Sequence, residues 1–239
     1  MTRFSHLLHR YLLTALVGVV VSAGCGEEAN VAPVASLGER PQEVTTTSDV
    51  EASAPAGNSA PAGNAVELDP KYPEVAITTS LGTIKVRLDA VKAPVTVGGF
   101  LRAAENGLYD GTIFHQVERG YIAVGGQYDA SMEKRPASPT LRNEADSALS
   151  NKRGAIAMTR DPAVIDSSTG PFFFNLVDNP HLDHENSEDP TKYGYCAFGN
   201  IIEGLEVLDE IAEKKVAALG ELDYVPAEPI VIKTVKRLR

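Results

Sequence analysis

The pattern of apolar and polar residues changes sharply near residue 74. Beyond this point, short apolar segments alternate with Gly, Pro and Asp, which is typical of chains rich in β-strands. The segment from Val75 to Asp89 alternates apolar and polar residues on both sides of Leu81-Gly82 and predicts a β-hairpin. Further strands are predicted in the segments TIFHQV, YIAVGG, GAIAMTR, PFFFNLV, YCAFGNII and PIVIKTVKRL.

Two segments have helical spacing instead. The first opens at Ala93-Pro94, stops at Asn106-Gly107 and places on one face Val97, Phe100, Leu101 and Ala104. The second runs from Gly204 to Val216, with one face made of Leu205, Leu208, Ile211 and Ala212. Many strands and two helices predict a mainly β fold, a closed antiparallel β-barrel of about eight strands capped by two α-helices.

The first 25 residues have the pattern of an export signal. Arg3 and Arg10 precede an apolar run that is too short to span a bilayer comfortably, and small residues lead to Cys25. The ending VSAGC resembles the lipobox of bacterial lipoproteins, in which the cysteine carries lipid, although Ser22 departs from that motif. An ordinary cleaved signal peptide with an incidental cysteine is the alternative. We expect residues 1–25 to be a lipoprotein-type signal peptide.

Residues 26–73 are rich in Ala, Pro, Gly, Thr and Glu, and the sequence SAPAGN occurs twice in succession. Such a composition offers too little apolar surface to offset its ordering entropy, so we expect a disordered tether. Its eight acidic and two basic residues account for −6 of the chain's net charge of −10. The chain lacks the positive field that nucleic-acid binding requires, and we expect no nucleic-acid partner.

Residues 74–239 then form the folded domain. Its single cysteine, Cys196, lies in an apolar segment, and we interpret it as core packing rather than as a reactive thiol. We expect a monomer without a cofactor.

Four blocks of sequence resemble the signatures of the cyclophilin family, in the family's order and at nearly its spacing. These blocks are FHQVERGYIAVGGQYD from Phe114, GAIAMTR from Gly154, PFFFNLVDNPHLD from Pro171 and AFGNIIEGLEVLDEI from Ala197. The resemblance implies a peptidyl-prolyl cis-trans isomerase, which rotates the peptide bond before proline over a barrier of about 20 kcal/mol. Such an enzyme needs an apolar pocket for the proline ring and donors that stabilise the twisted amide.

The resemblance implies an intact apolar pocket. The family's pocket positions are occupied here by Tyr121, Ile122, Phe173, Leu182 and Tyr195. Thr159 and His115 also fall at site positions, and His115 is either a hydrogen-bonded structural histidine or a ligand contact.

The polar positions depart from the family pattern. Gln116 occupies the place of the family's catalytic arginine, Val124 that of a glutamine which orients the arginine, and Pro171 that of a glutamine which contacts the substrate backbone. His181 stands where Trp or Phe is usual. A neutral Gln116 loses the charge-assisted part of the stabilisation. Arg119 and Arg160 could replace the missing cation, but we interpret both as solvated or structural.

Two functions remain open on these residues. The first is an isomerase, weakened by the loss of the arginine, that assists the folding of exported proteins by acting on their proline-containing segments. The alternative is a non-catalytic, chaperone-like module that binds proline peptides. The lipid on Cys25 would hold the protein in the cell envelope, facing the periplasm, and Gly26 favours the outer membrane by analogy.

The loop HLDHENSED, from His181 to Asp189, collects two imidazoles and several carboxylates. This composition is able to ligate a divalent ion, but it is also that of an ordinary solvated acidic loop. We prefer the second interpretation and predict no metal site.

Overall fold

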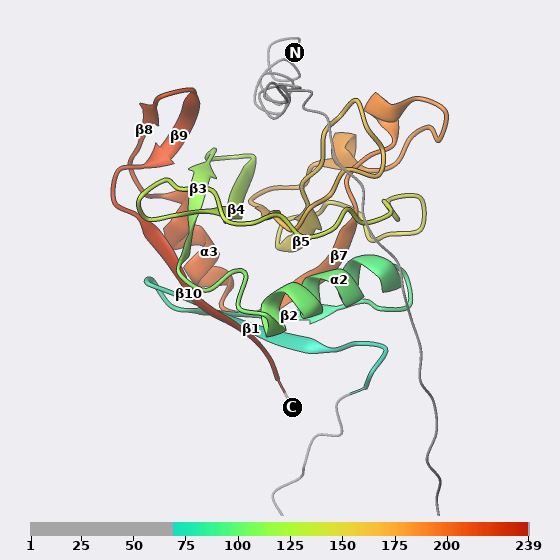
Figure 1. The fold of residues 1–239 in the computed structure, drawn as a ribbon, viewed down its shortest axis with the longest axis horizontal. Helices are drawn as coiled ribbons and strands as arrows, with labels where there is room; N and C mark the ends of the chain where they lie inside the picture. Colours follow the sequence, from blue (N-terminus) through green and yellow to red (C-terminus); the bar gives the residue numbers. More distant parts are fainter. Residues whose placement is uncertain (1–68, 239) are drawn as a thin grey trace, which may run out of the picture. The chain divides into compact units, whose positions relative to one another are not determined.

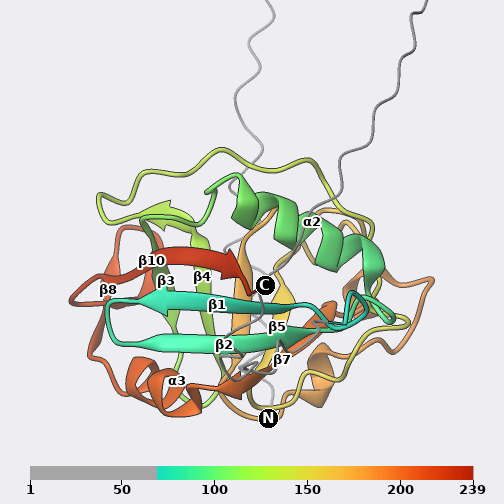
Figure 2. The ribbon, with the colours of Figure 1, turned by 90° about the horizontal axis from the view of Figure 1, so that it is seen from below.

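The computed structural model describes residues 69–238, so the predicted signal peptide, Cys25 and nearly all of the predicted tether lie outside the described residues. Eight strands form a closed antiparallel barrel in the order β1-β10-β3-β4-β6-β5-β7-β2 (Figures 1 and 2). They are β1 (Glu74–Thr79), β2 (Thr83–Leu88), β3 (Thr112–Val117), β4 (Ile122–Asp129), β5 (Ala155–Met158), β6 (Phe172–Asn175), β7 (Ala197–Glu203) and β10 (Ile230–Arg237). The predicted fold class is confirmed.

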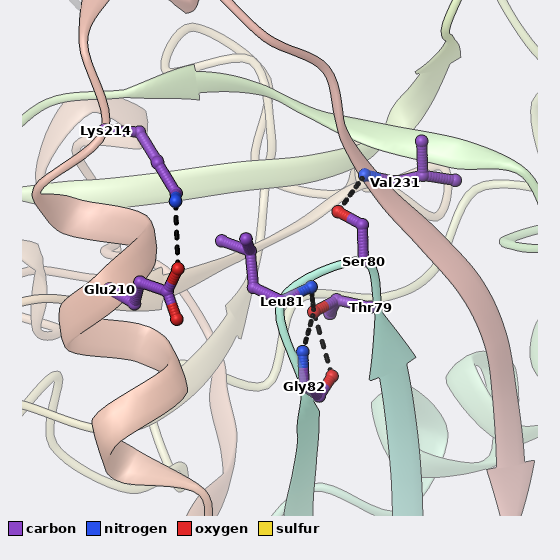
Figure 3. Close-up of polar contacts among 7 residues, drawn as sticks. All are labelled: Thr79, Ser80, Leu81, Gly82, Glu210, Lys214 and Val231. Atoms are coloured by element: carbon purple, nitrogen blue, oxygen red, sulfur yellow. Dashed lines mark hydrogen bonds and ion pairs between the residues drawn. The ribbon is translucent and has the colours of Figure 1, made fainter.

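The predicted hairpin is β1 and β2, and a threonine closes its turn. The Thr79 hydroxyl accepts hydrogen bonds from the backbone N–H groups of Leu81 (3.0 Å) and Gly82 (3.1 Å) and donates to the Gly82 carbonyl (Figure 3). Ser80 joins this turn to the start of β10, because its backbone N–H donates to the Val231 carbonyl and its hydroxyl accepts from the Val231 N–H. The first and last strands of the domain are thereby joined side by side.

The five described residues before β1 also contact the barrel. The backbone carbonyl of Lys71 accepts from the N–H of Ala90, and that of Pro73 accepts from the N–H of Leu88. Residues 69–73, at the end of the predicted tether, therefore form a turn that is hydrogen-bonded to the end of β2.

Helix α2 (Pro94–Glu105) begins and ends where the sequence predicts. Its first residue is a proline, and Ala93 before it has no side chain able to cap the helix. The buried carboxylate of Glu144 caps it instead, accepting from the N–H groups of Val95 (3.0 Å) and Thr96 (2.8 Å) and from the Thr96 hydroxyl. A negative charge at this end complements the helix dipole.

Helix α3 (Leu205–Ala212) is shorter than predicted, because Val216 belongs to a strand. Gly204 has φ +87° and starts the helix, while Lys214 pairs with Glu210 one turn earlier, at 2.9 Å (Figure 3). Val207, Leu208 and Ile211 are the buried positions, whereas Leu205 and Ala212 are only partly buried. Val207 is buried because it packs against Gly82 in the β1–β2 turn, where a side chain would clash with it.

The sequence analysis missed a hairpin outside the barrel. Strands β8 (Val216–Leu219) and β9 (Leu222–Pro226) pair only with each other and are joined by Gly220-Glu221. All of β8 is exposed, so it shows no alternation of apolar and polar residues that would signal a strand. In Figure 1 the hairpin projects beside β3, and β9 packs close to that strand.

The barrel interior is a single aromatic core. Its centre is a set of fully buried rings, Phe100, Tyr109, Phe114, Phe172, Phe174 and Phe198. Cys196 belongs to the same core, as predicted, and burial raises the pKa of its thiol to about 12. Neither described helix has the length and apolarity to span a bilayer, a statement limited to residues 69–238.

Candidate active site

A second, smaller apolar cluster lies on the outer face of the barrel. Because side chains alternate along a strand, Phe172 and Phe174 point into the barrel core while Phe173 between them joins the outer cluster. We call the outer cluster the apolar floor; it consists of Ile122, Val124, Ala155, Ala157, Phe173, Leu182, Tyr195 and Ala197. The rings of Phe173 and Tyr195 meet edge to face at 5.8 Å, a favourable geometry for an aromatic pair.

The apolar floor lies at the base of a cavity of about 990 Å³. Nine of the predicted site residues line it: His115, Gln116, Ile122, Val124, Thr159, Pro171, Phe173, Leu182 and Tyr195. Residues from β3, β4 and β6 and from two loops, separated by up to eighty positions in the sequence, thus meet at one surface. A cavity of this size and apolar character is typical of a small-ligand or peptide site.

Tyr121 and His181 do not line the cavity. Their rings stack on each other, with centroids 5.7 Å apart and planes 16° from parallel. Tyr121 also packs against the apolar floor, so this pair forms its outer edge.

One wall of the cavity holds the three positions that depart from the family pattern, Gln116, Val124 and Pro171, of which Val124 also belongs to the apolar floor. Gln116 and Val124 are direct partners across β3 and β4, so the two positions that depart together from the family pattern are neighbours in space. The side chain of Gln116 hydrogen-bonds no other residue of the described range and is free to donate to a ligand. The Pro171 carbonyl accepts from the N–H and the hydroxyl of Thr159, both at 3.0 Å, which places Thr159 as a support for this wall.

His115 is buried next to Gln116, and its ring meets that of Tyr128 at 4.9 Å. Its Nδ1 atom is buried without a hydrogen-bond partner among residues 69–238. Burial lowers the pKa of His115 to about 4, and the nearby Lys134 lowers it further, while the backbone of Ile113 opposes this shift. The ring is therefore neutral at pH 7.

Neither candidate replacement for the missing cation is free to act. Arg160 is buried, not solvated, and its guanidinium donates to the backbone carbonyls of Gly194 (2.7 Å), Asp161 (2.9 Å) and Pro190 (2.6 Å). It also lies over the ring of Tyr195, 5.1 Å from its centroid. Arg160 also lines the cavity, but its guanidinium is engaged in holding two loops together.

Arg119 is exposed, is not among the residues lining the cavity, and forms an ion pair with Glu213 at 2.7 Å. A cation that sequence reasoning missed is Lys134, which lines the cavity with its ammonium 5.8 Å from the centroid of the Tyr128 ring.

Two further segments line the cavity and were also missed. Ser131, Met132 and Lys134 come from the loop after β4, and residues 219–222 form the tip of the β8–β9 hairpin. Both segments lie outside the four signature blocks, and only the barrel topology brings them to the site.

Several polar side chains of the His181–Asp189 loop form hydrogen bonds with nearby residues of the protein. The His184 ring contacts the Tyr193 carbonyl (2.8 Å) and the Ser187 hydroxyl (3.1 Å), and Asp189 caps Thr191. Asp183 accepts from the backbone of Asn151 at 2.6 Å. In residues 69–238 no group of three or more His, Cys, Asp or Glu side chains is arranged to hold a metal ion.

Comparisons with known proteins agree with this geometry. Residues 74–237 match the family described as cyclophilin type peptidyl-prolyl cis-trans isomerase/CLD. Peptidyl-prolyl cis-trans isomerase A of Dickeya dadantii is 40% identical over 165 residues, covering 69% of this chain and 84% of the relative. Peptidyl-prolyl cis-trans isomerase B of Escherichia coli is 35% identical over 161 residues, covering 67% of this chain and 97% of the relative.

A solved structure of the Cryptosporidium parvum cyclophilin type peptidyl-prolyl cis-trans isomerase cgd2_1660 shares the fold. Its TM-score is 0.59 at 23% identity, and the match covers 70% of this chain and 98% of that one. The barrel, the signature blocks and the relatives together place this chain in the cyclophilin-type peptidyl-prolyl cis-trans isomerase family.

Proposed function

We propose that this protein catalyses cis–trans isomerisation of Xaa-Pro bonds in exported polypeptides, at a rate limited by the absence of a cationic donor. The observation that carries the proposal is the apolar floor, in which the edge-to-face pair of Phe173 and Tyr195 lies beneath an open cavity. A proline ring has the size and apolarity to pack against these rings. The peptide bond before that proline would then lie beside Gln116.

The chemistry requires no nucleophile or metal. Rotation breaks amide resonance, and the nitrogen regains a lone pair that a hydrogen-bond donor in the wall can stabilise. Gln116 lines the cavity and would supply such a donor from its side-chain amide, but this donor is neutral. Loss of one preorganised donor of this kind typically costs about a hundredfold to a thousandfold in rate, and the remaining acceleration would come from binding and desolvating the twisted amide.

The test is a refolding assay on an exported protein whose slow phase is limited by prolyl isomerisation. The full chain at sub-stoichiometric concentration should accelerate that phase, since the uncatalysed step takes tens of seconds or more. Phe173→Leu, which keeps an apolar side chain at the floor, should retain part of the acceleration. A slow phase unchanged at equimolar protein would contradict the proposal.

A second candidate function is a chaperone-like module that binds proline peptides without turnover. The specific observation in its favour is the wall, where Gln116, Val124 and Pro171 all depart from the family pattern and lie together. It predicts that a peptide containing Ala-Pro binds the full chain while its cis–trans exchange rate stays at the value in buffer. Failure to bind at millimolar peptide would contradict both candidates.

The proposal includes export and attachment to the outer membrane through lipid on Cys25. It is supported by the sequence of residues 1–25, with its basic start, short apolar run and VSAGC ending. Expression in a bacterial host with labelled fatty acid is the test. Wild-type protein should carry label and sediment with membranes, and Cys25→Ser should do neither. Unlabelled wild-type protein in the soluble fraction would contradict the anchor.

A further inference from the structure

The cavity is lined by more than the apolar floor and the wall. The loop after β4, with Ser131, Met132 and Lys134, and the tip of the β8–β9 hairpin, residues 219–222, also line it, and we call this part of the lining the far end. Figure 1 shows this hairpin projecting from the barrel beside β3 and β4, the strands that carry Gln116 and Val124. A peptide whose proline lies on the floor would therefore extend a neighbouring residue toward this end.

The far end exposes apolar side chains that the domain does not use for its own packing. Leu219 is 52% exposed, belongs to neither apolar cluster, and yet lines the cavity. Leu222 pairs with it across the hairpin and lines the same end. A bulky leucine held at a hairpin tip gains contacts only when another apolar group covers it.

Met132 lines the same cavity from the loop after β4, in a backbone conformation that residues other than glycine rarely adopt. Its φ is +63°, which is costly for a residue other than glycine. Asp129 imposes this turn, because its carboxylate accepts from the N–H groups of Ser131 (2.9 Å) and Glu133 (3.1 Å) and its carbonyl accepts from the N–H of Met132 (2.9 Å). This turn holds the side chain of Met132 at the cavity, and that side chain is apolar, unbranched and able to adapt its shape to a ligand.

The charges at this end have opposite signs. Lys134 and Glu221 both line it, one from each segment, and Lys134 lies over the ring of Tyr128. A ligand residue with a single charge therefore meets one attractive and one repulsive group, which leaves the apolar side chains to set the preference.

We propose that Leu219, Leu222 and Met132 form a second subsite, which selects substrates with a large apolar residue, such as Leu, Met or Phe, next to the proline. This inference rests on the proposed binding of proline peptides at the apolar floor and names the substrate class of that site.

The test compares affinities, which do not depend on turnover. Short peptides carrying Ala, Leu or Glu directly before or directly after proline are titrated into the full chain and followed by NMR. The peptides form two series, with the varied residue before or after proline. In one of the two series the Leu peptide should bind about fivefold to tenfold more tightly than the Ala peptide, as expected for burying most of one leucine side chain. Leu219→Ser should remove this preference, so that the Leu and Ala peptides bind the variant with similar affinity.

Val216→Ser is the matched control, because Val216 is an exposed apolar residue of the same hairpin that does not line the cavity. It should keep the preference for Leu, and Leu219→Met should restore most of it. Equal affinities for the Ala and Leu peptides would overturn this inference alone. Tightest binding of a Glu peptide would also overturn it, in favour of Lys134. If no proline peptide binds, the proposed function fails together with this inference.

Discussion

The apolar floor and the wall of the cavity are neighbours that follow the family pattern to different degrees. The floor residues Ile122, Phe173, Leu182 and Tyr195 keep the apolar or aromatic character that the resemblance leads one to expect, whereas Val124, which belongs to both the floor and the wall, departs from the family pattern. The floor residues also pack against one another, so their loss would cost stability as well as binding. The side chain of the wall residue Gln116 makes no hydrogen bond within the described range. Under the proposed function, a proline ring would bind mainly at the floor and a twisted amide would be stabilised from the wall, where Gln116, Val124 and Pro171 depart from the family pattern.

Removing the largest ring of the floor is expected to have the greatest effect. Phe173→Ala should lower the free energy of unfolding by about 4 kcal/mol, because it leaves a cavity among well-packed side chains. Denaturant titration measures this loss, and peptide affinity should fall at least tenfold in the protein that remains folded. A stable variant that still binds peptide normally would show that the floor is not the binding surface.

The pH dependence of stability tests the buried state of His115. Its pKa is about 4 in the folded protein and near the ordinary 6.5 when unfolded, so between these values the unfolded chain binds a proton that the folded one does not. Stability from this group is complete above pH 6.5 and should fall by about 3 kcal/mol as the pH drops to 4.

Denaturant titrations at pH 7, 5.5 and 4 measure this effect, with His115→Gln as the reference. The variant should lack this part of the pH dependence. If the free energy of unfolding changed with pH in the same way in wild type and variant, His115 would not be shielded from solvent.

Changing Gln116, a wall residue that is not part of the apolar floor, should alter rate more than affinity. Gln116→Arg should raise the catalytic rate about a hundredfold, equivalent to about 2.7 kcal/mol of transition-state stabilisation, with little change in peptide affinity. Because Val124 provides no partner to orient the new arginine, Gln116→Arg with Val124→Gln should exceed the single variant. A protease-coupled assay measures both. An unchanged rate would mean that more than the cation has been lost.

The smallest effect is expected at Arg119. Arg119→Gln removes an exposed ion pair with Glu213, and such pairs contribute at most about 0.5–1 kcal/mol. Neither peptide affinity nor rate should change, because the residue lies away from the cavity. A clear loss of rate in this variant would identify Arg119 as the replacement cation after all.

Much of the fold could be predicted because its signals are local. The alternation around Leu81-Gly82 gave the first hairpin, and Pro94 with Asn106-Gly107 marked the ends of α2. The β8–β9 hairpin was missed because its first strand is exposed on both faces and carries no alternation. Helix α3 was predicted too long for the same reason, since nothing local separates Lys215 from a helix.

Site residues could be predicted from the sequence only in or next to the four signature blocks. Apart from Tyr195, which lies just before the fourth block, the predicted floor and wall residues come from those blocks, and the structure brings nine of the predicted site residues together. Lys134, Met132 and Leu219 reach the cavity through long-range topology, to which no local pattern points. The role of Arg160 was equally hidden, because its partners are backbone carbonyls that any sequence would supply.

The central claim is that binding is retained while catalysis is limited by the wall. Exchange NMR on an Ala-Pro peptide with the wild-type full chain measures both quantities in one sample. We predict that peptide resonances shift on binding and that cis–trans exchange is faster than in buffer but slower than with Gln116→Arg. Exchange as fast as with Gln116→Arg, or no shift of peptide resonances at millimolar concentration, would contradict the account.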